Sequence, residues 1–347
     1  YGFYDLSEDF QLKFNLYDAN RGIPVWTKLK NENKRTMALN IPNTYPAPEI
    51  NGVLISGFVA IDIEKAVYPR NLKTYLTDKG YILDVDYSRA AAEKEKFLVS
   101  LNKSLKIRRE VFNELLMNNE WNLAIAVFTE TDRMNHFLMN AFYEDDSEYS
   151  RIFADFYKYI DNCIEDLFGL FENKVENIII ISDHGFEKLE TEFFLNYFLE
   201  EQKLLQFKSS EKIFPNISDK TICFACDPGR IYFNKKAGLS EKVKDEIKES
   251  IKYNLNKLRW NDRIVVKKIF EREEIYKGQF FENAPELLVL TENGIDIKGA
   301  PNRNTKFEKN AFTGMHTYEN AIYIANSNKP DIPENMDISK VLSTINL

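Results

Sequence analysis

Cysteine is scarce in this sequence, with three copies among 347 residues. Three thiols cannot form the disulfide framework that stabilises many small secreted domains. This usage fits a reducing compartment, and we therefore predict a cytoplasmic location. The chain opens at Tyr1 with no methionine, which leaves room for a targeting or structural segment upstream.

Long hydrophobic runs and an excess of positive charge are absent as well. The longest apolar stretches are short, such as residues 178–181, whereas a membrane-spanning helix needs roughly 20 apolar residues. The 46 basic residues are outnumbered by 54 acidic ones, which gives a net charge of −8. Binding to a nucleic-acid polymer usually needs a basic face and is not expected here. A small anionic substrate would need local positive charge, which bound metal ions can supply.

Apolar and aromatic residues, by contrast, are plentiful. Apolar side chains make up 44% of the chain, which includes 26 Phe and 18 Tyr. A chain of 347 residues with this composition is long enough to bury a sizeable core. It suits one large α/β domain with an insertion, or two modest domains.

Two continuous apolar runs with a helix between them indicate the fold class. Residues 122–128 and 177–182 have the form of strands that are buried on both faces of a parallel sheet, and residues 148–171 are predicted to be helical. Strand, helix and strand form a βαβ unit, so we predict a three-layer α/β/α fold with a mostly parallel sheet and an inserted smaller subdomain. Ligands of such sheets collect beyond the carboxyl ends of the strands, where residues 129–136 and 183–185 fall.

The remaining elements follow from hydrophobic period and from the positions of proline and glycine. Before the βαβ unit we predict a helix followed by a strand over residues 25–41, a strand at 53–56, and an amphipathic helix or helix pair over 88–119. After it we predict a helix at 191–203, a strand that ends near Phe233, a helix at 239–258, and strands at 265–270 and 287–290. The predicted domain organisation is a core over 1–190, an insertion or subdomain over 191–300, and a return to the core over 301–347.

The strongest local signal is Ser182-Asp183-His184-Gly185, directly after the isoleucine-rich run. It places a carboxylate and an imidazole side by side on a turn, and Gly185 permits tight backbone geometry there. A second signal is Thr131-Asp132 with His136 four residues later, a spacing that turns both side chains to one side of a helical turn. The third is Gly314-Met315-His316, which precedes the apolar run at 321–325.

Each of these signals alone has an ordinary structural explanation. An Asp-His pair in a loop is more often a turn or a cap than a metal site, and a single histidine is usually a surface or core residue. Their joint placement favours a metal site, because the chain has three histidines and all three fall in these motifs. Mixed carboxylate and imidazole ligands suit zinc best. The predicted ligands are Asp132, His136, Asp183, His184 and His316.

The same residues resemble the alkaline phosphatase superfamily, and most closely its type I phosphodiesterase/nucleotide pyrophosphatase branch. The resemblance rests on Thr131-Asp132-x-x-x-His136, on Ser182-Asp183-His184-Gly185-Phe186 and on Gly314-x-His316. It extends in order over nearly the whole chain and includes Tyr1-Gly2-Phe3-Tyr4-Asp5, the stretch from Asn40-Ile41-Pro42 to Tyr45-Pro46, and the stretch from Asn51-Gly52 to Ser56-Gly57-Phe58.

This resemblance implies two divalent ions, with zinc as the expected metal. Asp132, His136 and His316 would hold one ion, and Asp183 and His184 the second. It also implies an aspartate on the first strand and a Thr or Ser nucleophile, both upstream of the segment that begins at Tyr1. We expect that stretch to be missing from the sequence rather than from the protein, since a sheet without its first strand would expose an unpaired edge. The chain by itself is expected to be inactive.

The predicted function is hydrolysis of a phosphodiester or nucleotide pyrophosphate bond in a small phosphorylated substrate. Two ions about 4 Å apart can activate a nucleophile and stabilise the leaving oxygen of an in-line displacement. A hydroxyl nucleophile would form a covalent phospho-enzyme that water then opens. The ligands do not specify the substrate and do not distinguish diesters from monoesters.

Two alternatives stay open at this point. The first is a non-catalytic metal-binding pseudoenzyme or scaffold that keeps the ligands without a nucleophile. The second is a sulfatase, because Cys226-Asp227-Pro228-Gly229-Arg230 fits the C-x-P-x-R pattern from which those enzymes make formylglycine. In sulfatases this pattern precedes the metal motifs, whereas here it follows Asp183-His184 by about forty residues.

Cys226 also forms a C-x-x-C pair with Cys223. Residues three apart on a strand point to opposite faces, so we expect neither a shared metal nor a disulfide.

Overall fold

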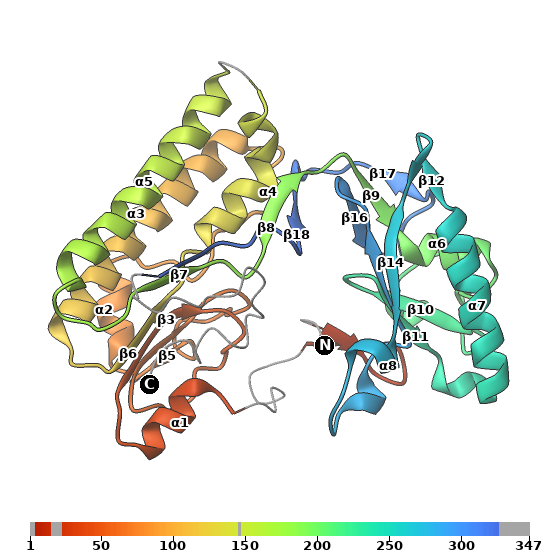
Figure 1. The fold of residues 1–347 in the computed structure, drawn as a ribbon, viewed down its shortest axis with the longest axis horizontal. Coiled ribbons are helices and arrows are strands. Elements are labelled where there is room, and N and C mark those ends of the chain that lie inside the picture. Colours follow the sequence, from red (N-terminus) through yellow and green to blue (C-terminus); the bar gives the residue numbers. More distant parts are fainter. Residues whose placement is uncertain (1–3, 15–22, 145–146, 326–347) are drawn as a thin grey trace. The chain divides into compact units, whose positions relative to one another are not determined.

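The computed structural model describes residues 4–14, 23–144 and 147–325, which fall into two compact units. The site unit, as we call it here, comprises described residues 23–144, 147–187 and 311–325. The second unit, here called the 188–310 unit, adds residues 4–14 to that range. Figure 1 labels the elements of both. The division of the chain into domains at residues 190 and 300 stays a prediction.

A four-stranded sheet with the order β5-β4-β3-β6 forms the base of the site unit. Its strands are β3 (Thr36–Ile41), β4 (Gly52–Ser56), β5 (Val67–Tyr68) and β6 (Leu123–Ala126). Both β4 and β6 run parallel to β3, and only the short β5 runs antiparallel to its neighbour. The sheet is therefore mostly parallel, as predicted.

Helices cover both faces of this sheet. Met37 and Leu39 of β3 pack in one apolar cluster with Phe112, whereas Ala38, between them in the sequence, packs in another with Trp26. This alternation is the two-residue period by which neighbouring side chains of a strand face opposite sides. Because Phe112 belongs to α3 and Trp26 to α1, the unit has the three predicted layers.

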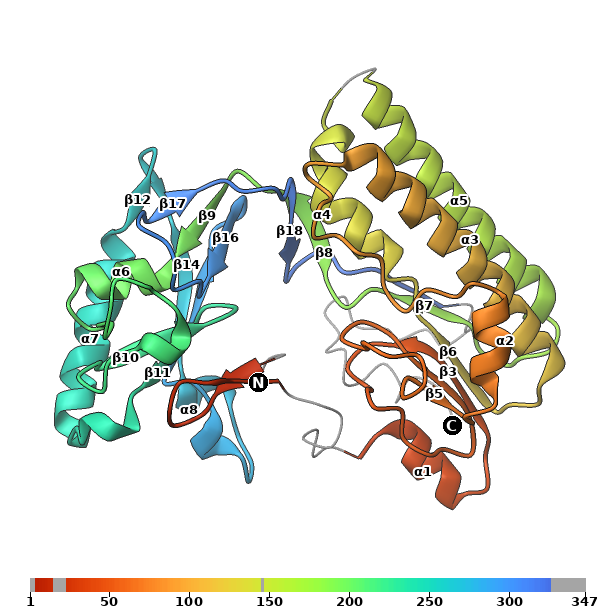
Figure 2. The ribbon, with the colours of Figure 1, turned by 180° about the vertical axis from the view of Figure 1, so that it is seen from behind.

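The helices of the site unit are α1 (Val25–Asn31), α2 (Leu72–Asp78), α3 (Lys94–Asn118), α4 (Glu130–Phe142) and α5 (Glu148–Phe171). Both ribbon views show α3 and α5 side by side (Figures 1 and 2), and together with α4 they enclose a cluster that includes Leu101, Phe137 and Phe156. The predicted segment 88–119 contains a single helix, and α4 extends well beyond the one turn expected around Asp132. No helix within the described ranges combines the length and apolar character needed to cross a membrane.

The isoleucine-rich run at 177–182 forms strand β7 (Ile179–Ile181), but its pairing differs from the prediction. It pairs antiparallel with β19 (Tyr323–Ala325) in a separate two-stranded sheet, and no pairing joins it to β6 among the described residues. Ile181 is 45% exposed, so the strand is not buried on both faces. The predicted second strand of the βαβ unit was therefore wrong. The apolar run predicts an extended segment but does not identify the strand that pairs with it, and that strand, β19, lies far along the chain.

Next to β7, the chain enters β8 (Gly185–Lys188), which pairs with β18 (Gly314–Thr317). This pairing brings the segment that follows residue 310 back to the site unit. It joins two of the motifs singled out in the sequence, at Asp183-His184 and at His316.

The 188–310 unit contains two larger sheets. One has the order β10-β11-β15-β14, with neighbours antiparallel, and consists of β10 (Cys223–Cys226), β11 (Arg230–Phe233), β14 (Val266–Glu271) and β15 (Leu287–Thr291). The other has the order β16-β9-β17 and consists of β9 (Thr191–Phe194), β16 (Ile295–Lys298) and β17 (Phe307–Glu308). The strands predicted near residues 233, 265–270 and 287–290 are confirmed.

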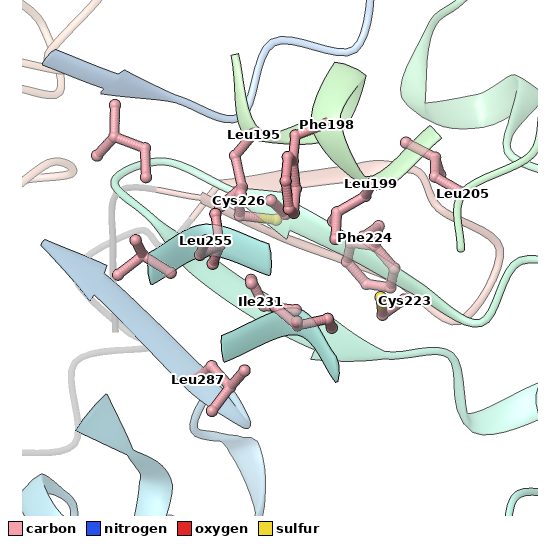
Figure 3. Close-up of a cluster of buried hydrophobic side chains, with 14 of the residues drawn as sticks. Leu195, Phe198, Leu199, Leu205, Cys223, Phe224, Cys226, Ile231, Leu255 and Leu287 are labelled. Carbon is pink, nitrogen blue, oxygen red and sulfur yellow. The ribbon is translucent and has the colours of Figure 1, made fainter. Parts of the chain in front are cut away.

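Shorter elements complete this unit. Its helices are α6 (Leu195–Glu201), α7 (Glu241–Lys257) and α8 (Arg272–Ile275), and two hairpins are formed by β1 (Tyr4–Leu6) with β2 (Leu12–Phe14) and by β12 (Arg259–Trp260) with β13 (Arg263–Ile264). Figure 3 shows part of its core, in which Leu195, Phe198 and Leu199 of α6 pack near Phe224 and Cys226 of β10.

The helix predicted at 191–203 begins four residues later than expected. Thr191–Phe194 instead forms β9, which pairs in parallel with β16 and antiparallel with β17. Threonine and phenylalanine favour a pleated, buried surface, and tertiary pairing decides the outcome where local preference is weak. The helix α6 then follows directly as Leu195–Glu201.

Candidate metal centre

All five predicted ligands lie in the site unit, on three separate pieces of chain. Asp132 and His136 lie one helical turn apart on α4, which turns them to the same side of the helix. Asp183 and His184 occupy the bend between β7 and β8, and His316 lies on β18.

Three of these side chains form a close triangle around one point. The distance from His316 Nε2 to Asp132 Oδ1 is 3.0 Å, that from His316 Nε2 to His136 Nε2 is 3.0 Å, and that from His136 Nε2 to Asp132 Oδ1 is 3.6 Å. Ligand atoms on a tetrahedral zinc ion, at 2.0–2.1 Å from the metal, lie about 3.3 Å from one another. The spacing of this triangle therefore fits a single zinc-sized ion.

The other two side chains adjoin this triangle. His184 Nε2 lies 3.9 Å from Asp132 Oδ1 and 3.5 Å from Asp183 Oδ2. Ligand atoms of Asp132, His184 and His316 also lie within 4.8 Å of one another. Asp132 thus lies near His316 and His136 and also near His184. The Asp183 side chain is 80% exposed. Asp132, His136, His184 and His316 converge, although the sequence separates them by up to 184 positions, and Asp183 lies beside His184.

Backbone carbonyls fix the orientation of two imidazoles. His136 Nδ1 lies 3.2 Å from the carbonyl oxygen of Gly314, and His184 Nδ1 lies 3.2 Å from that of Gly185. With a proton on Nδ1, each ring donates to its carbonyl and turns Nε2 toward the cluster. Metal-binding histidines typically donate their second ring nitrogen in this way.

Aromatic rings enclose the imidazoles. Phe186 contacts all three histidines, with ring centroids 5.0 Å from His136, 5.4 Å from His184 and 4.9 Å from His316. The rings of His184 and His316 stack with centroids 3.7 Å apart. Burial and the nearby charge of His316 lower the pKa of His184 below its ordinary value, which favours the neutral imidazole that binds a metal.

Two glycines allow the three pieces of chain to approach. A Cβ atom at Gly185 would lie 2.6 Å from Thr317 Oγ1, and one at Gly314 would lie 2.3 Å from the carbonyl oxygen of Asn135. The sequence predicted tight geometry at Gly185. The reason is close approach of a neighbouring strand, since no left-handed φ is found at this residue.

The Asp132 carboxylate is held in its charged form. Burial opposes ionisation, but the hydrogen bond to His316 and the charges of His136 and Arg133 outweigh it and lower the pKa of Asp132 to about 2. Its second oxygen, Oδ2, accepts a hydrogen bond of 3.0 Å from Arg133.

Sequence reasoning missed the residues that support the ligands. Arg133 and Phe186 stand beside predicted ligands in the sequence, yet neither is a ligand type, so a search for donors passed over them. Asp84, which pairs with Arg133, lies 49 positions away with no spacing that connects them. Contacts of this kind arise from tertiary packing.

The sulfatase-like pattern has a structural role in the 188–310 unit. Cys226 is fully buried at the end of β10, and burial raises the pKa of its thiol to about 12. Arg230 donates hydrogen bonds to the carbonyl oxygens of Asp227 and Tyr4 and forms an ion pair with Asp5. Cys226 and Cys223 are both buried free thiols.

Residues 1–319 match the model of the family named type I phosphodiesterase / nucleotide pyrophosphatase. The chain belongs to this family. The resemblance drawn from its motifs is thereby confirmed, and the protein is a hydrolase of the phosphodiesterase/pyrophosphatase type.

One solved structure agrees with this chain at the level of the fold. Phosphonoacetate hydrolase from Sinorhizobium meliloti 1021, in complex with phosphonoformate, aligns with a TM-score of 0.54 at 14% identity, over 96% of this chain and 75% of that chain. Murine ectonucleotide pyrophosphatase / phosphodiesterase 5 aligns at 15% identity with a TM-score of 0.42, over 87% of this chain and 63% of its own. No curated protein matches the sequence.

Proposed function

We propose that the five side chains hold two divalent ions, with zinc as the metal, and that the protein hydrolyses a phosphodiester or phosphoanhydride bond in a small phosphorylated substrate. The observation that carries this proposal is the triangle of Asp132 Oδ1, His136 Nε2 and His316 Nε2, with sides of 3.0, 3.0 and 3.6 Å. Family membership supplies the reaction class.

In this proposal Asp132, His136 and His316 hold one ion, and Asp183 and His184 hold the second. When bound, such ions act as Lewis acids toward phosphoryl oxygens and promote deprotonation of a nucleophile. The two carboxylates balance part of the charge of the ions. The 3.9 Å separation of Asp132 and His184 supports neighbouring sites rather than distant ones.

The residues around the ligands preorganise the site. The carbonyl oxygens of Gly314 and Gly185 hold the His136 and His184 rings with Nε2 directed inward. Phe186 presents an apolar ring to all three histidines, which excludes water from that side. Preorganised ligands bind an ion without a large entropic cost of ordering side chains.

The nucleophile is proposed to be a Thr or Ser that precedes Tyr1, on a segment that also contributes an aspartate. Among the described residues, β6 pairs only with β3 and β7 only with β19, so each has one edge to which a further strand could be added. Natural proteins usually pair or cover strand edges that would otherwise stay open. The open edges of β6 and β7 therefore support the proposal that an upstream segment adds a strand near the proposed metal ligands.

The test uses the complete gene product, loaded with zinc and assayed against bis-p-nitrophenyl phosphate, p-nitrophenyl phosphate and p-nitrocatechol sulfate. We expect turnover of a phosphate ester. Asp183→Asn is expected to reduce it by at least about 100-fold with loss of bound zinc, because ligands contribute more than the outer-shell residues for which 10- to 100-fold effects are typical. Asp155→Asn, an equally exposed carboxylate on α5, serves as the matched control and should change turnover less than twofold.

Other results would select one of the alternatives. Zinc binding without turnover of any ester would favour the metal-binding pseudoenzyme or scaffold. Turnover of the sulfate ester alone would favour a sulfatase, against which the burial of Cys226 argues. Absence of zinc binding to the complete protein would contradict the metal centre itself.

A further inference from the structure

Arg133 connects a proposed metal ligand to the interior of the site unit. Its Nη1 donates a hydrogen bond of 3.0 Å to Asp132 Oδ2. On its other side the guanidinium makes two bonds to one carboxylate, from Nε to Asp84 Oδ1 at 3.2 Å and from Nη2 to Asp84 Oδ2 at 2.6 Å. Arginine is suited to this paired geometry because its donors form a rigid planar fork.

The surroundings of Arg133 leave it little freedom. The residue is 7% exposed, and its guanidinium lies 4.7 Å from the ring centroid of Phe58 and 4.5 Å from that of Tyr87. Asp84 is held in turn, since its Oδ1 also accepts a hydrogen bond of 3.0 Å from the backbone N–H of Val85. The guanidinium is therefore fixed by a carboxylate at one edge and by aromatic rings beside it.

The two oxygens of Asp132 have different partners. Oδ1 lies 3.0 Å from His316 Nε2 and 3.6 Å from His136 Nε2, whereas Oδ2 is taken by Arg133. A carboxylate held in this way can offer an ion one oxygen rather than two. Single-oxygen coordination suits the low coordination number of zinc, whereas calcium often takes both oxygens of a carboxylate.

We propose that Arg133, anchored by Asp84, is a positioning residue that orients Asp132 as a one-oxygen ligand of the metal centre. The proposal rests on the proposed metal function of Asp132. The hydrogen bond of Arg133 to a proposed ligand goes to Asp132. Arg133 acts by orienting the carboxylate of Asp132.

The charge of Arg133 and its role in orienting Asp132 predict opposite effects on zinc affinity, which makes the role testable. A cation beside Asp132 repels a metal ion, so if the charge of Arg133 were its only contribution, removing it would strengthen zinc binding. Loss of an outer-shell partner that orients a ligand typically weakens metal affinity by 10- to 100-fold. The sign of the change in affinity therefore distinguishes the two roles.

The experiment measures zinc dissociation constants of the complete gene product by competition with a chromophoric chelator, at a temperature where every variant is folded. Arg133→Gln is expected to weaken binding of at least one zinc ion by about 10-fold or more. Arg133→Lys keeps the charge but not the fork, and should also weaken binding. Asp84→Asn leaves Arg133 in place but loosens its anchor, so a smaller loss in the same direction is expected.

The matched controls lie on α3 and contact α4, the helix that carries Arg133, through bonds to Glu130 rather than to a proposed ligand. Arg108 makes a buried ion pair with Glu130 of α4, and Ser104 donates a hydrogen bond to the same carboxylate. Arg108→Gln and Ser104→Ala should lower thermal stability while the folded protein binds zinc within twofold of the wild type. This separates loss of stability from loss of ligand orientation.

Unchanged or tighter zinc binding by Arg133→Gln and Asp84→Asn would overturn the inference. So would an equal loss of affinity in the Arg108 and Ser104 controls, because a general loosening of α4 would then account for it. If the wild type itself bound no zinc, the proposed function would fail first, and the two failures are therefore distinguishable.

Discussion

Arg108 and Glu130 form an ion pair in the interior of the site unit, with 2.8 Å between Nε and Oε1 and side chains that are 1% and 2% exposed. The pair joins α3 to the first turn of α4. Tyr81 accepts a further hydrogen bond from the same guanidinium, and Ser104 donates one to Glu130. The network therefore joins α4 to α3 in the interior of the site unit and contributes to its stability.

Breaking this pair should strongly destabilise the protein. Glu130→Ala leaves the Arg108 charge buried without its carboxylate, and we expect the free energy of unfolding to fall by about 3–5 kcal/mol. Urea denaturation followed by circular dichroism measures the change. Lys158→Ala, which breaks an exposed pair with Asp155, should cost less than about 1 kcal/mol. Similar losses for the two variants would contradict the assigned role of burial.

The glycines of the β8–β18 pairing offer a second test. Gly314→Ala would place a Cβ 2.3 Å from the carbonyl oxygen of Asn135, and Gly185→Ala would place one 2.6 Å from Thr317 Oγ1. We expect each to lower stability by about 1–3 kcal/mol, as overpacking does, and to weaken zinc binding because His184 and His316 shift. Thermal denaturation and zinc titration measure both effects.

Gly169→Ala is the control for these substitutions. No atom outside its own stretch of helix lies within 4 Å of the added Cβ, and the residue lies in the last turn of α5. Alanine should stabilise that helix by roughly 0.5–1 kcal/mol and leave zinc affinity unchanged. Retention of full zinc affinity by Gly314→Ala and Gly185→Ala would show that the close approach of β18 to α4 and to Gly185 is unimportant for the site.

Glu192 predicts a pH-dependent contribution to stability in the 188–310 unit. Burial raises the pKa of its carboxyl above the ordinary value, and a hydrogen bond from Asn310 and the charge of Lys298 offset this only in part. An acid with a raised folded-state pKa destabilises the fold as pH rises above the unfolded-state value, near 4.3 for glutamate.

Glu192→Gln keeps the shape and can accept the bond from Asn310, but it has no charge to bury. Its free energy of unfolding should therefore exceed that of the wild type at pH 7.5, and the difference should shrink toward pH 4. Urea denaturation at both pH values measures it. A variant that is less stable than the wild type at pH 7.5 would show that ionised Glu192 is stabilising there.

The three thiols should be unreactive in the folded protein. Burial raises the pKa of Cys163 to about 11 and that of Cys226 to about 12, and the pKa of buried Cys223 is raised as well. A thiol with a pKa of 11 is ~0.1% thiolate at pH 8, and only the thiolate reacts. Ellman's reagent should therefore modify the native protein slowly and all three cysteines rapidly in urea. Fast modification of native Cys226 would restore interest in the sulfatase alternative.

The sequence was most informative where one local rule decided the structure. The four-residue spacing of Asp132 and His136 corresponds to one turn of α4. The strands predicted at the end of 25–41, at 53–56 and at 122–128 are present and run parallel. Asp183 and His184 follow β7 directly, as the run of isoleucines predicted. Their roles as metal ligands stay a prediction.

Features that depend on distant partners were not predictable in this way. β7 was expected in a parallel sheet and pairs antiparallel with β19, and residues 191–194 form a strand because β16 and β17 flank them. The Asp84–Arg133 pair likewise joins a loop to a helix across 49 positions. In each case the deciding contact joins two segments, and the local sequence of neither segment identifies the other as its partner.

The pairing of β8 with β18 has a consequence for the unfolded chain. All of residues 189–313 lie between these strands, so the chain must close a loop of roughly 120 residues before His184 and His316 can meet. Closure entropy grows only with the logarithm of length, and this loop costs about 2 kcal/mol more to close than a ten-residue one. An ion held by Asp132 and His136 of α4 and by His316 of β18 would act as a reversible cross-link across that loop. Insertions within the 188–310 unit should therefore change the coupling between metal binding and folding only slightly.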